Sequence, residues 1–246
     1  MKEVDNTTIM LEIHDLKKHF GENKVLNGFD MALKEGENLV IMGKSGSGKS
    51  VMIKCLMGLM QPDSGDIRIM GKTVFELEQT ELDQLRKKIG FLFQGSALYD
   101  SMTVRENLEF PLRKQNMPQK EKDKLVIQAL ESVGLLDAIE LVPNELSGGM
   151  KRRVALARAI ILHPKIIIYD EPTTGLDPIT AKEIIQLMRE IQEIYGSSAL
   201  IITHDVDCSR VIADRMILLI DGVNYAEGSF KELSSSSDER IQAFFK

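Results

Sequence analysis

Short apolar runs rich in β-branched residues alternate along the chain with stretches in which apolar residues recur at helical spacing. This alternation is typical of an α/β fold with a buried, largely parallel sheet. Two of the runs, 10–16 and 66–69, predict strands of a small antiparallel region. Turn or polar residues bound the other runs, which predicts further strands at 39–42, 89–93, 166–170, 199–203 and 216–220.

Helical patterns predict helices at 49–59, 178–195 and 207–213. The strand signals disappear between about 94 and 159, where we expect an inserted helical subdomain with helices at 119–133 and 151–161. Near the end of the chain, the four serines 234–237 predict a flexible linker, and 238–245 predicts a short amphipathic segment. We therefore expect one domain, with a core formed by 1–93 and 160–246 and a helical insertion at 94–159.

Composition places the chain among ordinary globular proteins, because 43% of its 246 residues are hydrophobic and 28% are charged. The net charge of −6 argues against binding to nucleic acid, which basic proteins favour. Cys55 and Cys208 lie outside any metal-ligand spacing, which predicts reduced core thiols in a reducing cytosol. Glu3 and Asp5 argue against a signal peptide, and no apolar stretch approaches the roughly 18 residues that span a bilayer.

The segment 43–50 reads Gly-Lys-Ser-Gly-Ser-Gly-Lys-Ser and fits G-x-x-x-x-G-K-[ST], a loop whose N–H groups surround nucleotide phosphates. Its glycines allow the backbone to turn successive N–H groups inward, and the following helix adds a dipole that favours anions. Lys49 can reach the β- and γ-phosphates, and the Ser50 hydroxyl can bind Mg²⁺. A glycine–serine linker is the competing interpretation, but a strand and a helix do not flank linkers. The residues expected to hold the nucleotide here are Gly43, Lys44, Ser45, Gly46, Ser47, Gly48, Lys49, Ser50 and Val51.

Two adjacent carboxylates, Asp170 and Glu171, follow the apolar run 166–169. Carboxyl ends of strands in α/β proteins face the ligand crevice, so both side chains can point toward a substrate. Asp170 ends the strand and is the better magnesium ligand, which leaves Glu171 to polarise a water in line with the γ-phosphate. Taken alone, such a pair is usually a solvated turn.

Ser147, Gly148 and Gly149 form a third candidate site, because a serine and two glycines that open a helix expose N–H groups to an anion. A simple helix cap or tight turn is the competing interpretation. A chain with one complete phosphate loop gains from a second such element if two copies face each other and each lends it to the other's nucleotide.

In this order, these segments resemble the ATP-binding subunits of ABC transporters over nearly the whole chain, which implies a P-loop NTPase core. The resemblance implies that Ser147–Gly149 contacts the γ-phosphate across a head-to-tail dimer. It also implies that Gln94 reaches Mg²⁺ and the attacking water, that His204 contacts the γ-phosphate, and that Asp177 lies in a dimer-interface loop. Phe20 falls where the family stacks an aromatic ring on adenine, a position that is more often Tyr. The implied cofactors are ATP and Mg²⁺, with Ser50, Gln94 and Asp170 as the metal ligands.

Segments 93–108, 110–113, 149–160, 177–180 and 238–245 resemble more narrowly the ATPases of Mla-type lipid-transport systems. Those systems pair the ATPase with a membrane permease and a lipid-binding MCE-domain protein, and they move phospholipids between the two membranes of bacteria. The resemblance implies a subunit on the cytoplasmic face of the inner membrane that hydrolyses ATP as a homodimer. The apolar residues 97–98 and 110–112 are candidates for a groove that receives a permease helix, with packing of the insertion as the alternative.

Three other functions are compatible with parts of this pattern. An ABC ATPase for another cargo, such as an amino acid or a lipoprotein, shares parts of the narrower pattern. A soluble ABC-type ATPase, such as an iron–sulfur assembly factor, fits the phosphate site but fits segment 99–113 less well. A P-loop kinase should lack the Ser147–Gly149 element, so its presence argues against that class.

Overall fold

The computed structural model describes residues 8–245, so Glu3 and Asp5, on which the signal-peptide expectation rests, lie outside the described residues. The chain forms two compact units. Unit 1 consists of the residues up to Arg86 and those from Ser197 onward, and unit 2 consists of Lys87–Gly196. The division expected from the sequence, with a helical insertion at 94–159, stays a prediction.

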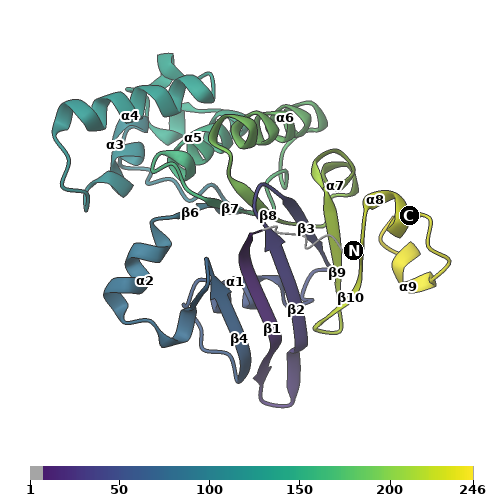
Figure 1. The fold of residues 1–246 in the computed structure, drawn as a ribbon. Coiled ribbons are helices and arrows are strands. Elements are labelled where there is room, and N and C mark those ends of the chain that lie inside the picture. Colours follow the sequence, from purple (N-terminus) through teal and green to yellow (C-terminus); the bar gives the residue numbers. More distant parts are fainter. Residues whose placement is uncertain (1–7, 246) are drawn as a thin grey trace, which may run out of the picture. The chain divides into compact units, whose positions relative to one another are not determined.

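Unit 1 contains two groups of paired strands (Figure 1). One is an antiparallel sheet in the order β2-β1-β4-β5, and the other is a run of adjacent strands in the order β10-β9-β3-β8. Their bounds are β1 (Ile9–Phe20), β2 (Asn23–Lys34), β3 (Asn38–Met42), β4 (Ser64–Ile69), β5 (Lys72–Thr73), β8 (Ser198–Thr203), β9 (Arg215–Ile220) and β10 (Val223–Gly228).

The central strand of the second group is β3, and every one of its residues is buried. It runs parallel to both β8 and β9, with Met42 opposite Thr203 and Leu218. A strand that is covered on both faces reads as a continuous apolar run, as the sequence Leu-Val-Ile-Met does in β3. The predicted fold class, an α/β P-loop NTPase core with a mostly parallel sheet and a small antiparallel region, is confirmed.

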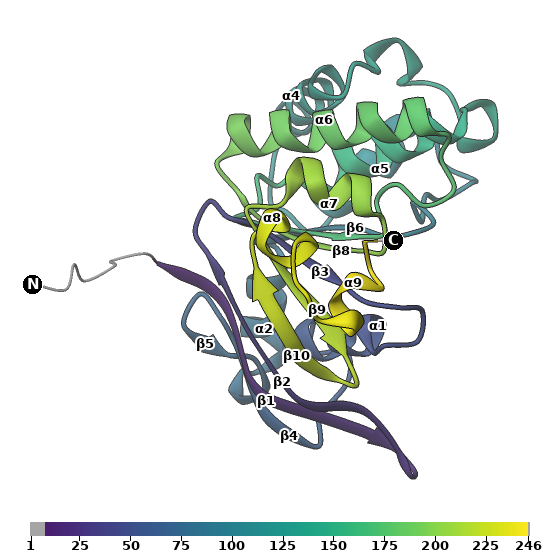
Figure 2. The same cartoon turned by 90° about the vertical axis from the view of Figure 1, so that its right-hand side faces the viewer.

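The helices of unit 1 connect or follow its strands, and the last two helices, α8 and α9, lie beside β10 (Figure 2). The four serines are not the predicted flexible linker. Ser234 ends α8, the Ser235 hydroxyl donates to Lys231 O at 2.8 Å, and Gln242 Nε2 donates to Ser236 O at 2.7 Å. The bounds are α1 (Lys49–Leu56), η1 (Val74–Glu76), α2 (Gln79–Arg86), α7 (Val206–Ile212), α8 (Phe230–Ser234) and α9 (Glu239–Gln242).

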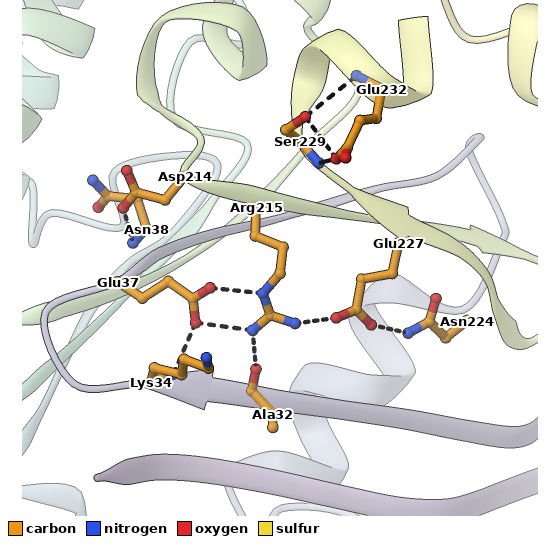
Figure 3. Close-up of polar contacts among 10 residues, drawn as sticks. All are labelled: Ala32, Lys34, Glu37, Asn38, Asp214, Arg215, Asn224, Glu227, Ser229 and Glu232. Atoms are coloured by element: carbon orange, nitrogen blue, oxygen red, sulfur yellow. Dashed lines mark hydrogen bonds and ion pairs between the residues drawn. The ribbon is translucent and has the colours of Figure 1, made fainter. Parts of the chain in front are cut away.

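An ion-pair cluster around Arg215 ties the start of β9 to three other segments of unit 1 (Figure 3). Its guanidinium donates to both carboxylate oxygens of Glu37, at 2.7 and 2.9 Å, and to Ala32 O at 2.5 Å. A further ion pair joins it to Glu227 on β10. The hydrogen bonds to Glu37 raise the pKa of Arg215. One side chain therefore fixes β2, β9, β10 and the turn before β3 against one another.

Unit 2 combines a parallel pair of strands with helices that supply most of its core. Its α5 helix buries Val154, Leu156 and Ile160, and Gly90 on β6 lets α5 approach closely, because a Cβ there would lie 2.4 Å from Ala159 O. The bounds are β6 (Ile89–Leu92), α3 (Val104–Glu109), η2 (Phe110–Leu112), α4 (Gln119–Ser132), η3 (Leu136–Ala138), η4 (Pro143–Glu145), α5 (Gly148–Ile160), β7 (Ile166–Asp170) and α6 (Pro178–Tyr195).

The described part of the chain contains no strand between Leu92 and Ile166, as the sequence predicts. The first predicted helix is too long, because α1 ends at Leu56 and Gly58 then takes a left-handed conformation with φ of 63°. The apolar pattern did not reveal β2 or β10. Across residues 8–245, no helix is both long enough and apolar enough to cross a bilayer.

Candidate functional site

The glycine-rich loop of unit 1 connects buried β3 to α1, as the sequence predicts. Gly48 caps the helix with φ of 105°, a conformation that side chains disfavour, and a Cβ there would lie 2.9 Å from Val25 O. A Cβ on Gly43 would lie 2.4 Å from Ser47 Oγ. The loop is therefore compact, and the backbone contact and positive φ at its end require glycine at 48.

Lys49 lies in the first turn of α1 and folds back over this loop. Its Nζ donates to Gly43 O at 2.5 Å and to Lys44 O at 3.1 Å. The ammonium is therefore held at the mouth of the loop, where a phosphate can replace a carbonyl as its partner. Ser47 Oγ is buried and has no hydrogen-bond partner within the described residues, so it is one donor available to such an anion.

His204 leaves the sheet beside this loop. It follows Thr203, the last residue of β8, and Thr203 pairs with Met42, which directly precedes Gly43. Because paired ends of parallel strands lie at one edge, unit 1 brings the His204 backbone and the start of the loop together. The His204 side chain is exposed, and Asp205 caps α7 immediately after it. Val51 follows Ser50 in α1 and is partly exposed.

A cavity of ≈ 560 Å³ adjoins the loop within unit 1. Loop residues 44–47 form one wall, Val25 and the β9–β10 turn form another, α9 contributes Arg240, and the segment after α9 contributes Phe244. Figure 2 shows the yellow α9 beside β9 and β10. The sequence pattern does not mark Arg240 and Phe244 as residues of the site. Their amphipathic spacing was visible in the sequence, but the cavity that they line was not.

Side-chain contacts hold α9 beside the cavity. Arg240 forms an ion pair with Asp221 and lies 4.4 Å from the ring centroid of Tyr225. The Tyr225 hydroxyl donates to Asp238 Oδ2 at 2.7 Å, and this bond lowers the pKa of Asp238, which caps α9. These contacts therefore fix α9 as a wall of the cavity.

Phe20 ends β1 in a tight hairpin and is opposite Asn23. Its ring is 48% exposed, with Lys18 Nζ 5.8 Å from the centroid. The half-exposed ring is not a core aromatic.

In unit 2, the parallel pairing of β6 with β7 brings two further predicted residues to one edge. Leu92 pairs with Tyr169, so Phe93 and Gln94 leave the sheet next to Asp170 and Glu171. The Gln94 side chain is exposed, and Asp170 is partly exposed. Tyr169, which precedes the two carboxylates, is fully buried, and its burial raises its pKa.

Glu171 has a backbone that β-strands do not adopt, with φ of 50°. This turn takes its side chain out of the alternation of the strand, so Glu171 can face the same edge as Asp170. Only 7% of Glu171 is exposed, and its Oε2 accepts a hydrogen bond from Thr174 Oγ1 at 3.2 Å. A non-glycine residue in this conformation is uncommon and often marks a functional turn.

Ser147 caps α5, and its hydroxyl accepts from Met150 N at 3.2 Å. Ser147 and Gly148 are exposed, and the first N–H groups of a helix have no partner within it. Gly149 packs against α6, because a Cβ there would lie 2.6 Å from Thr180 Cγ2. The N-terminus of α5 therefore presents backbone donors at the surface of unit 2.

Asp177 caps α6, as the Asp-Pro pair predicts. Its carboxylate accepts from Thr180 Oγ1 at 2.5 Å and from the N–H groups of Ile179 and Thr180. These bonds, led by that of the Thr180 hydroxyl, lower the pKa of Asp177.

The residues predicted to hold Mg²⁺ fit that ion in their donor chemistry. Ser50, Gln94 and Asp170 offer a hydroxyl, an amide oxygen and a carboxylate, which are the hard oxygen ligands that Mg²⁺ prefers. Among residues 8–245, no three His, Cys, Asp or Glu side chains are grouped to hold a metal on their own. Magnesium sites of this composition are completed by substrate phosphates and water.

Known proteins are similar to this chain in sequence and in fold. A model of the family described as ABC transporter matches residues 26–174. The methionine import ATP-binding protein MetN of Brucella abortus is 40% identical over 219 residues, which cover 89% of this chain and 59% of that protein. The chain thus spans about three fifths of the length of these MetN relatives. The intermembrane phospholipid transport system ATP-binding protein MlaF of Haemophilus influenzae is 37% identical, over 96% of this chain and 90% of that protein.

Two solved structures extend this similarity to three dimensions. A dimeric post-hydrolysis state of the ATP-binding cassette MJ0796, bound to ADP and Pi, matches with a TM-score of 0.80 and 35% identity over 91% of this chain and 100% of that one. CbiO1 from Clostridium perfringens, part of the transporter complex CbiONQ, matches with a TM-score of 0.86 and 29% identity over 97% of this chain and 96% of that one.

Proposed function

The chain belongs to the ABC transporter family, and on this premise we propose that it is an ATP-hydrolysing subunit that powers a membrane permease. The observation that carries the proposal is the loop of unit 1, where Lys49 is held over a compact glycine-rich turn. The carboxylate turn of unit 2 supports it, because Glu171 is nearly buried at a strand's carboxyl end. The ADP and Pi bound to MJ0796 are the products that this reaction would release.

In the proposed reaction, the loop residues and Lys49 bind the triphosphate, and the exposed Phe20 ring stacks on adenine. Ser50, Gln94 and Asp170 would hold Mg²⁺, which would supply neutralisation of the phosphate charge. Glu171 accepts the proton of the attacking water, Gln94 orients that water, and His204 contacts the γ-phosphate.

We further propose that two copies form each working site. The exposed N-terminus of α5, with Ser147, Gly148 and Gly149, would close over the nucleotide on the loop of a second copy, with Asp177 at the dimer interface. The dimeric state of MJ0796 supports this arrangement. The competing interpretation of Ser147 as a helix cap agrees with its bond to Met150, so the backbone donors of Gly148 and Gly149 carry the expected contact.

Substitution of Ser147 by arginine tests the composite site. Ser147→Arg should block hydrolysis while nucleotide binding to the intact loop of the same copy stays normal, because the bulky side chain would obstruct only the partner's nucleotide. Binding is measured with a fluorescent ATP analogue, and turnover by phosphate release. Normal turnover in Ser147→Arg would disprove the composite site and leave the loop assignment intact.

For the cargo we propose phospholipid, which would place the subunit on the cytoplasmic face of the inner membrane beside a permease and an MCE-domain protein. Two observations favour it: the match to MlaF covers more of this chain than the match to MetN, and segments 93–108 and 238–245 resemble Mla-type ATPases. Methionine is the second candidate, because MetN relatives are slightly more identical in sequence.

A cluster of exposed aromatic residues in unit 2 offers a contact for the permease. Tyr99 and Phe110 lie with ring centroids 4.6 Å apart, and both are exposed, as is Phe93. Leu112 is fully buried, so part of the predicted apolar cluster packs inside the unit.

Purification of the full chain with its native membrane partners would distinguish the cargoes. We expect a permease, an MCE-domain protein and bound phospholipid, with ATP turnover that responds to added phospholipid vesicles. A complex whose turnover responds to methionine and that carries no phospholipid would replace phospholipid with methionine as the cargo.

A further inference from the structure

Arg152 is a nearly buried arginine on α5, only 4% exposed, and both of its hydrogen-bond partners among the described residues are backbone carbonyls. Its Nε is buried without a partner in that part of the chain, and burial lowers the pKa of its guanidinium. An arginine that is buried without a carboxylate is costly, so its placement calls for an explanation other than an ion pair.

The first carbonyl belongs to the turn that carries Gln94. Ser96 N donates to Phe93 O at 2.9 Å and closes a four-residue turn with Gln94 as its second residue. Arg152 Nη1 donates to the same Phe93 oxygen at 2.8 Å. The guanidinium thus holds the turn at the residue directly before Gln94.

The second carbonyl belongs to the turn that carries Glu171. Thr174 N donates to Glu171 O at 3.3 Å, and the Thr174 hydroxyl donates to the Glu171 carboxylate at 3.2 Å. Arg152 Nη2 donates to Thr174 O at 3.2 Å. The residue that holds the Glu171 carboxylate is therefore itself held by Arg152.

We propose that Arg152 is a positioning residue that sets the turns of Gln94 and Glu171 at a fixed distance from each other. The two Nη atoms belong to one rigid planar group, so the carbonyls that they bind cannot move independently. This inference rests on the proposed function, in which Gln94 orients the water that Glu171 deprotonates. Arg152 touches neither reactant and acts through Phe93 and Thr174.

The same helix links these turns to the surface. Because Ser147 caps α5, a displacement of α5 that follows nucleotide contact there carries Arg152 and both turns with it. Arg158, also on α5, donates to Ser96 O and Ala97 O at 2.9 and 2.8 Å and so holds the Gln94 turn only. Arg152 is thus the residue on α5 that bridges both turns in the described structure.

Hydrogen exchange of the full chain tests the bridge without any need for catalysis. Arg152→Gln keeps a planar donor, but its side chain is shorter and both of its N–H groups lie on one nitrogen, so it cannot reach both carbonyls as the two Nη atoms do. We expect faster exchange of the Ser96 and Thr174 amides together. The matched control is Arg153→Gln, because Arg153 neighbours Arg152 on α5 and contacts Glu183 and Val133 O, which belong to neither turn. Unchanged exchange at either amide in Arg152→Gln would overturn the proposal.

The kinetic arm measures the consequence. We expect kcat to fall roughly 10-fold to 100-fold in Arg152→Gln, with little change in nucleotide affinity, and to stay normal in Arg153→Gln. If Arg152→Gln fails to fold, Arg152→Lys replaces it. The lysine variant should lose less kcat than the range given for Arg152→Gln, again with little change in nucleotide affinity. Normal kcat in a folded Arg152 variant would overturn the proposal. An inactive wild-type chain would instead count against the proposed function, and the exchange experiment would still judge the bridge.

Discussion

The loop of unit 1 and the turns of unit 2 hold candidate functional groups by different means. The loop keeps its shape through its own backbone: Gly43 and Gly48 leave no room for a side chain, and Lys49 bonds carbonyls within the loop. The turns of Gln94 and Glu171 depend on a side chain from a helix more than fifty residues after one and about twenty before the other. The loop, which holds its own shape, suits a ligand group that does not change. The two turns of unit 2 are held by α5 and can be displaced when that helix moves.

The largest expected effect separates rate from affinity. Glu171→Gln removes the proposed base but keeps the shape of the side chain, so kcat should fall by roughly 10²–10⁴. Nucleotide binding should persist, and a nucleotide-bound dimer should accumulate, as measured by size exclusion with retained radiolabelled ATP. Retained turnover would remove Glu171 from the role of base and would erase the contrast between the two regions.

In unit 1, we expect a substitution to lower the affinity for nucleotide. Lys49→Ala removes a charged donor to phosphate, which is worth about 1.5–3 kcal/mol, so affinity for ATP should fall by roughly 10-fold to 100-fold. Equilibrium binding of a fluorescent ATP analogue measures this change, with thermal unfolding as the check that the chain still folds. Unchanged affinity would mean that the loop does not bind the phosphates.

The Arg215 side chain holds the strands of unit 1 together at a position away from the loop. Arg215→Ala breaks a partly buried cluster with Glu37 and Glu227, and it should lower the free energy of unfolding by about 2 kcal/mol. Urea unfolding measures the loss, and ATP affinity at low temperature should stay normal. A fall in affinity would show that the loop depends on remote packing, which would weaken the comparison.

The two positive-φ glycines of the loop provide a finer test of its local construction. Gly48→Ala should destabilise the protein by about 1 kcal/mol more than Gly46→Ala, because a Cβ at 48 meets Val25 O whereas a Cβ at 46 meets nothing within 4 Å. Thermal unfolding of the pair measures the difference. Equal losses would show that backbone conformation alone, and not the close approach of β2, selects glycine.

The smallest effect concerns the cap of α6 in unit 2. Asp177→Ala should lower Tm by about 2 °C at neutral pH. The folded-state pKa of Asp177 is depressed, so its contribution is present above its ordinary pKa and is lost as the pH falls through the folded value. The Tm difference between wild type and variant should therefore be constant near pH 7 and shrink in acid. A difference that grew in acid would contradict the assignment.

The sequence predicted what is encoded in continuous patterns. The apolar runs predicted β3, β7 and β8 because both faces of these strands are buried, and the Asp-Pro pair predicted the start of α6. It missed β10, in which no residue is fully buried, so no apolar alternation marks it. The serines at 234–237 were misread because composition does not reveal that Ser235 bonds a helix carbonyl.

The candidate site divides in the same way. The loop residues are predictable from the sequence because they are adjacent in the chain. Arg152, Arg240 and Phe244 are not, because their importance depends on which carbonyls or cavity walls the fold brings within reach. The roles assigned to Gln94, Glu171, Ser147 and His204 remain predictions.

The position of α9 has a practical meaning for inhibitor chemistry. The family match ends at residue 174, whereas Arg240 and Phe244 lie far beyond it and yet share a cavity with the glycine-rich loop. A small molecule that spans from Ser45 to Phe244 would use a wall that the shared family segment does not contain. Such a compound would bind partly through residues outside the segment that the family model matches, which offers a basis for selectivity.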